Sequence, residues 1–104
     1  MLSNIPVNWK SLVELGKEYP DVELVRIGVI AELDAVNLYE QLASLAKNED
    51  VKNVFLDIAR EEKEHFGEFM ALLNSLDKEI VEAVREGGEE VNELKNKIGD
   101  KNDR

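Results

Sequence analysis

Apolar residues recur at a helical period along two long stretches of the chain, residues 22–47 and residues 51–76. They follow one another in steps of three and four, which is the spacing of side chains on one face of an α-helix. In the first stretch this face comprises Val25, Val29, Glu32, Val36, Tyr39, Ala43 and Ala46. In the second it comprises Val51, Phe55, Ile58, Glu62, His65, Phe69, Leu72 and Leu76. The pattern predicts two long helices, and no stretch shows the alternation typical of a β-strand.

The short connection between these helices determines how they pack. Asp21, after Pro20, is expected to be the N-cap of the first helix. Residues 48–50 separate the two helices, and Asp50 is expected to cap the second. Because helices joined by so few residues pack antiparallel, residues 21–76 are predicted to form a helical hairpin. Residues 1–20, which include Trp9, are expected to be a lead-in with a short helix.

The C-terminal part of the chain, residues 77–99, is predicted to be helical but interrupted. Asp77 is expected to cap a helix over residues 78–86, which Gly87 and Gly88 then break. A weaker helix over residues 89–98 follows, Gly99 ends it, and the polar residues 100–104 are expected to fray. The predicted fold is therefore all-α, an antiparallel two-helix hairpin with a short C-terminal helix.

The composition excludes several classes of function. The chain has 104 residues, 13 basic against 23 acidic side chains and a net charge of −10, so it should repel nucleic acid. It has no cysteine, which excludes disulfides, thiolate metal sites and iron–sulfur clusters. It has neither an apolar run long enough to span a membrane nor the pattern of a signal peptide, so we expect a cytoplasmic protein. A single modest domain of this size favours self-association.

Three ionisable residues interrupt the apolar helix faces. Glu32 lies on the first helix, and Glu62 and His65 form an E-x-x-H element on the second. Residues three apart share a helix face, so this carboxylate and imidazole can bind one ion. With the turn near residue 48, partners across an antiparallel hairpin have numbers that add to roughly 97, which brings Glu32 level with His65. A buried carboxylate needs a compensating partner, and the sequence predicts that this partner is a metal ion.

This set of residues is half of a known kind of metal site. Ferritin-like di-iron proteins use one Glu from each of two helices and an E-x-x-H element from each of two others. One copy of this chain carries one such Glu and one such element. We therefore expect a homodimer that completes a four-helix bundle and binds the metal ions at its interface.

At these residues the chain resembles the encapsulated ferritins, the ferritin-like cargo of encapsulin nanocompartments. The resemblance rests on the segments IAELDAVNLYEQ and REEKEH. It implies a ferroxidase that supports iron storage, with Glu32, Glu62 and His65 as catalytic iron ligands and Tyr39 beside a di-iron centre. It further implies a decamer built as a pentamer of dimers, held inside an encapsulin shell in the cytoplasm.

Two other functions agree with the same residues. One is a rubrerythrin-like peroxidase, although such proteins usually carry a cysteine-ligated iron that this chain lacks. The other is a non-catalytic helical oligomer in which the buried charges fix the helix register, or bind a redox-inert metal. The sequence does not exclude calcium or zinc as an adventitious ion, because acidic sites accept both. Glu61, Glu64 and Glu68 are expected to form a solvated face.

Overall fold

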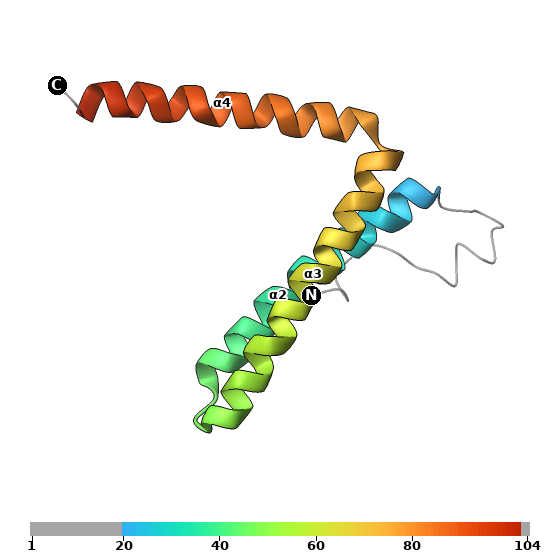
Figure 1. Cartoon of the computed structure of the whole chain (residues 1–104), viewed down its shortest axis with the longest axis vertical. Helices are drawn as coiled ribbons and strands as arrows, with labels where there is room; N and C mark the ends of the chain where they lie inside the picture. The colour runs from blue at the N-terminus through green and yellow to red at the C-terminus, as the bar shows by residue number, and fades with distance from the viewer. Residues whose placement is uncertain (1–19, 103–104) are drawn as a thin grey trace, which may run out of the picture. The chain divides into compact units, whose positions relative to one another are not determined.

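The computed structural model describes residues 20–102 as an all-α protein, with no strand in that range. Its helices are α2 (Asp21–Leu45), α3 (Glu49–Leu76) and α4 (Lys78–Asn102). Helices α2 and α3 run antiparallel and side by side, joined by the short connection at residues 46–48 (Figure 1). The all-α fold and the hairpin are thus confirmed. The expected lead-in helix and Trp9 lie outside the described residues.

The beginnings of the helices show which polar residues cap them. Asp77 accepts a hydrogen bond from the backbone amide of Ile80 (3.0 Å), which confirms it as the cap of α4. The cap of α3 is Asn48, whose side-chain oxygen accepts a hydrogen bond from the Val51 amide (3.0 Å). The prediction of Asp50 as this cap was wrong, because α3 begins one residue after Asn48. Asp21 is likewise the first residue of α2 rather than its cap, and Pro20 precedes it without a side-chain capping bond.

The core of the hairpin is small. Its buried apolar residues are Val36 and Ala43 on α2 and Ala59 and Leu73 on α3. The two from α2 lie on the predicted apolar face, whereas the two from α3 do not. At 100° per residue, the buried face of α3 is turned slightly away from the predicted one, toward the line of Ala59, Phe66 and Leu73.

Helix α3 consequently carries a second apolar face outside the hairpin core. Val51, Leu72 and Leu76 were predicted to lie in the core, but they are 46%, 51% and 50% exposed. Val54 is exposed beside them, on the same side of the helix. We call Val51, Val54, Ile58, His65 and Leu72 the outer face of α3; they follow one another at steps of three, four or seven residues.

The C-terminal helix departs most from the prediction. It is neither short nor interrupted, since α4 runs for 25 residues through Gly87, Gly88 and Gly99. Arg85 lies two residues before the glycine pair and contacts Glu82 and Glu89, with 2.6 Å between Arg85 Nη1 and Glu89 Oε1. The pair with Glu89 spans the glycines on the helix surface, and such pairs stabilise a helix locally. The expected helix end at Gly99 was also wrong, because α4 continues to residue 102. The fraying of residues 100–104 remains a prediction.

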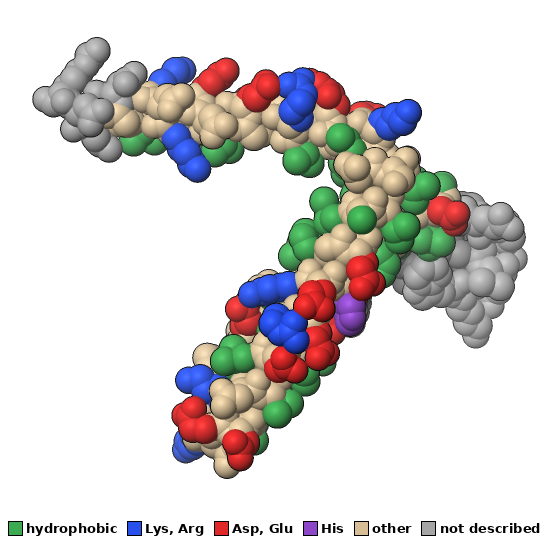
Figure 2. All heavy atoms as spheres, viewed as in Figure 1, with side chains coloured by type: hydrophobic (Ala, Val, Ile, Leu, Met, Phe, Trp, Pro, Cys, Tyr) green, Lys and Arg blue, Asp and Glu red, His purple; other side chains and the backbone are tan. Residues whose placement is uncertain are grey.

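Helix α4 is amphipathic, with charged side chains along one side and hydrophobic ones along the other (Figure 2). The chain divides into two compact units between Leu73 and Asn74, so that α4 belongs to a different unit from the hairpin. None of the helices in residues 20–102 is apolar for long enough to cross a bilayer.

Candidate metal centre

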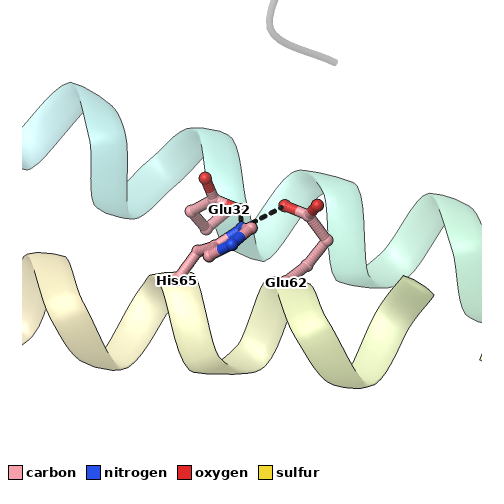
Figure 3. Close-up of side chains that lie close together, drawn as sticks. All are labelled: Glu32, Glu62 and His65. Carbon is pink, nitrogen blue, oxygen red and sulfur yellow. Dashed lines mark ion pairs between the residues drawn. The ribbon is translucent and has the colours of Figure 1, made fainter. Parts of the chain in front are cut away.

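The three predicted site residues come together in the middle of the hairpin. Glu32 extends from α2 toward α3, where Glu62 and His65 lie one turn apart (Figure 3). His65 Nδ1 is 3.8 Å from Glu32 Oε2 and 3.6 Å from Glu62 Oε2. One donor atom from each residue lies within 4.8 Å of the other two. The convergence that the register predicted is therefore present within a single chain.

The two carboxylates are much less accessible than the imidazole. The side chains of Glu32 and Glu62 are 18% and 20% exposed, against 49% for His65. Glu32 Oε2 is fully buried and accepts no hydrogen bond from the described residues. A buried carboxylate oxygen without a donor costs free energy, about 1–3 kcal/mol for an ordinary unsatisfied group. An ion that binds there would remove this cost.

The electrostatic environment of Glu32 agrees with this picture. Its pKa is raised above the ordinary value of 4.5. The largest cause is a side-chain hydrogen bond with Glu62, which exists only while one carboxyl group carries a proton; burial and the charge of Glu62 follow. His65 lowers this pKa, whereas Glu68 raises it further. Two carboxylates held this close repel each other until a cation binds between them.

The donor set matches transition metals better than other ions. Two carboxylates and one imidazole suit iron, manganese or zinc, whereas calcium prefers oxygen ligands alone. The unsatisfied Glu32 oxygen and the crowding of two carboxylates indicate that these residues fit a cation. Three donors are too few to complete the coordination of an iron ion, and one chain brings no second E-x-x-H element.

The site opens toward the outer face of α3. His65 belongs to that face and is half exposed, while Glu62 lies nearer the hairpin core. The surroundings of His65 are acidic, and Figure 2 shows its side chain among carboxylates. Both the imidazole and the neighbouring apolar side chains are therefore accessible to a second molecule.

Tyr39 lies two turns after Glu32 on α2. Its ring stacks on Phe55 of α3, with ring centroids 6.2 Å apart and an angle of 26° between the ring planes. This contact fills the hairpin beside the carboxylates. A role of the Tyr39 hydroxyl in iron chemistry remains a prediction.

Sequence reasoning missed one neighbour of the site. Glu61, Glu64 and Glu68 are exposed, as expected, and Glu64 forms an ion pair with Arg60 (2.6 Å). The charge of Glu68, however, also raises the pKa of Glu32. Its position one turn after His65 on the same helix was the available signal.

Comparisons with known proteins agree with the geometry. A family model described as rubrerythrin matches residues 23–104. A ferritin-like–encapsulin shell fusion protein of Pyrococcus furiosus is 52% identical over 87 residues, which cover 81% of this chain and 25% of that protein. The encapsulin nanocompartment cargo protein EncC of Myxococcus xanthus is 36% identical over 76 residues, covering 70% of this chain and 58% of the cargo protein. The chain thus spans only part of these relatives.

A solved structure covers nearly the same extent as this chain. The crystal structure of the encapsulated ferritin domain from Pyrococcus furiosus superposes with a TM-score of 0.72 at 46% identity. The match covers 88% of this chain and 89% of that one. The fold, the family model and the relatives all agree, and the chain belongs to the rubrerythrin family, among the encapsulated ferritin domains.

Proposed function

We propose that this chain is a ferroxidase that oxidises Fe(II) to Fe(III) at a di-iron site shared between two copies of the chain. Each copy supplies Glu32, Glu62 and His65. The observation that carries the proposal is the convergence of these three donors within 4.8 Å, around a buried Glu32 oxygen that has no donor. The membership of the rubrerythrin family supports iron as the metal.

A second copy is needed because one chain carries half of the ligands. The outer face of α3 supports this dimer, since His65 lies on the same side of the helix as exposed apolar side chains such as Val54 and Leu72. A copy packed on that face would bury apolar surface and bring its own three donors to the opening of the site. The two hairpins would then form a four-helix bundle.

In the reaction iron is the substrate, and the side chains bind it and balance its charge. Two Fe(II) ions each give up one electron, and dioxygen takes these two electrons with two protons to become hydrogen peroxide. Hard carboxylate oxygens from Glu32 and Glu62 favour the ferric product, while the imidazole of His65 suits ferrous iron. Repulsion between the carboxylates falls when a cation lies between them, which favours uptake of the ion.

The relatives suggest where this activity takes place. Two of them are encapsulin cargo proteins and one is a fusion to an encapsulin shell. We propose that this chain likewise works with an encapsulin shell, inside a cytoplasmic nanocompartment that stores the ferric product. A decamer built from five dimers is part of the same proposal, and Tyr39 is its fourth catalytic residue.

The decisive experiment adds Fe(II) aerobically to the protein and follows the absorbance of the ferric product. We expect rapid oxidation by the wild type and near-background rates for Glu32→Ala, Glu62→Ala and His65→Ala. Glu64→Ala is the matched control, because its exposed carboxylate lies two residues from Glu62 but pairs with Arg60. Equal rates for the wild type and all three ligand variants would overturn the proposal.

Native mass spectrometry tests the shared site separately. Two iron ions per dimer are expected, with none in the variants that lack a ligand. A metal-free dimer would favour a non-catalytic oligomer. Bound iron with turnover of peroxide by a reductase, but no oxidation by dioxygen, would instead indicate a rubrerythrin-like peroxidase.

A further inference from the structure

The ring of Phe69 on α3 lies directly against the backbone of Gly28 on α2. A Cβ atom built on Gly28 would lie 2.9 Å from two atoms of that ring and 3.0 Å from a third. Real Cβ atoms essentially never come so close to another heavy atom. Any other residue at this position would therefore require the ring or the helices to move.

This contact adjoins the candidate metal centre. Gly28 lies one helical turn before Glu32, and Phe69 lies one turn after His65. Since the helices are antiparallel, both residues lie at the same end of the three-residue cluster. The stacked pair of Tyr39 and Phe55 lies toward the other end. An aromatic contact thus lies on each side of the cluster of Glu32, Glu62 and His65 along the hairpin.

We propose that Gly28 and Phe69 are positioning residues for the metal centre, and this inference rests on the metal site proposed above. The absence of a side chain at Gly28 lets α2 approach the Phe69 ring closely. That approach sets the separation of the helices beside Glu32 and holds its carboxylate in reach of Glu62 and His65. The ring also covers this end of the cluster against water.

The physical argument concerns the consequences of adding one methyl group at Gly28. To reach an ordinary contact of 3.4–4 Å, the ring must turn away or the two helices must separate. If the ring turns away, water reaches the buried carboxylates; if the helices separate, Glu32 withdraws from its partners on α3. Both changes weaken a site whose donors depend on their mutual distances.

Gly67 provides a matched control. It is also a glycine within a helix of the hairpin, but a Cβ atom built on it meets nothing within 4 Å. The same change of one methyl group should therefore be harmless there, and even favourable, because alanine is the better helix former. A difference between the two positions can then be assigned to the contact with Phe69.

The test measures the metal affinity of the metal-free chain of 104 residues. Co(II) is titrated in and its visible absorption followed, so that the readout does not depend on iron oxidation. We expect Gly28→Ala to weaken Co(II) binding by about tenfold, the lower end of the range for residues that support metal ligands. Gly67→Ala should bind Co(II) like the wild type.

A second control separates positioning from simple loss of stability. Ala43 is buried in the hairpin, 11 residues from Glu32. Ala43→Gly should cost about 1 kcal/mol in the free energy of unfolding. It should nevertheless leave the Co(II) affinity unchanged. If loss of stability alone weakened Co(II) binding by Gly28→Ala, Ala43→Gly would weaken it as well.

If Gly28→Ala fails to fold, replacement of the Phe69 ring provides a second test. Phe69→Leu is expected to weaken Co(II) binding by leaving a gap over Gly28. The double variant Gly28→Ala/Phe69→Leu should recover affinity relative to Phe69→Leu, because the added methyl group fills that gap. Equal Co(II) affinity in the wild type and Gly28→Ala, or no recovery in the double variant, would overturn the positioning role alone. No Co(II) binding by the wild type would overturn the metal site as well.

Discussion

The hairpin of α2 and α3 differs from α4 in what becomes of its apolar residues. In the hairpin, Ala59 and Leu73 are buried. In α4, Val84, Val91 and Leu94 are each more than half exposed. Both regions carry an amphipathic helical pattern, so the pattern alone does not distinguish a helix with a core from one without. What distinguishes them is a packed neighbour.

The same difference decides how a glutamate should be interpreted. Glu32 lies on a face that packs against another helix, and its burial requires a compensating partner. Glu89 lies on the surface of α4, where its carboxylate is exposed to water and forms an ion pair with Arg85, so that it needs no further partner. The buried glutamate of the hairpin therefore indicates chemistry, whereas the exposed glutamate of α4 indicates solvation.

The largest effect that tests this comparison is the loss of apolar contacts. Leu73→Ala should lower the free energy of unfolding by about 2–5 kcal/mol, because Leu73 is only 3% exposed. Leu94→Ala, at 59% exposure, should change it by less than about 0.5 kcal/mol. Urea denaturation of the dilute, metal-free protein measures both. A large loss from Leu94→Ala would mean that another molecule covers α4 in solution.

The next largest effect is expected on Co(II) affinity, when one carboxylate is removed from each region. Glu32→Gln should weaken Co(II) binding by about 100-fold, at the upper end of the effects known for residues around metal sites, which corresponds to about 2.7 kcal/mol. Glu93→Gln, in exposed surroundings on α4, should leave the affinity unchanged. Isothermal titration calorimetry measures both constants. Similar losses in the two variants would mean that net charge, rather than the Glu32 site, attracts the ion.

Glycine substitutions test the helices themselves. The helix α4 passes through Gly87 and Gly88, where a Cβ atom would meet nothing within 4 Å. Replacement of each by alanine should therefore stabilise α4 by about 0.5–1 kcal/mol. Thermal unfolding followed by circular dichroism measures the gain. A loss of stability would show that these glycines lie against another chain in the assembled protein.

The sequence predicted the hairpin and its site well because both depend on local periodicity and the short turn. The positions of Glu32, Glu62 and His65 followed from the helix period and the antiparallel register. The buried face of α3 was less predictable, because this helix has two apolar faces and the sequence does not show which one packs on α2. Adjacent residues on it point in directions 100° apart, so the choice of face decides whether Leu72 or Leu73 is buried.

The continuity of helix α4 was not predicted, for a different reason. Glycine lowers helix propensity by only about 1 kcal/mol, which the neighbouring residues can offset. The pair Gly87-Gly88 predicts a break, but Arg85 and Glu89 flank it at the spacing of a surface ion pair. Whether a glycine ends a helix or merely weakens it depends on such neighbours.

The last effect concerns the stability cost of the site when no metal is bound. The pKa of Glu32 is raised above 4.5 in the folded chain, so the fold favours its protonated form. The stabilisation from that proton is complete below the unfolded pKa and is lost as the pH rises through the folded one. At neutral pH the ionised Glu32 therefore destabilises the metal-free hairpin. Glutamine at position 32 would keep the shape and remove the charge.

Glu32→Gln should accordingly stabilise the metal-free protein at pH 7, by about 1 kcal/mol if the unsatisfied oxygen dominates. The gain should fade as the pH is lowered toward 4.5, where the wild-type carboxyl becomes neutral too. Urea denaturation in the presence of a chelator, repeated across this pH range, measures it, with Glu93→Gln as the exposed control. With Co(II) present at 100 times its dissociation constant the order should invert, because binding stabilises the wild type by about 2.7 kcal/mol. A less stable Glu32→Gln at pH 7 without metal would mean that the protein itself already satisfies this carboxylate.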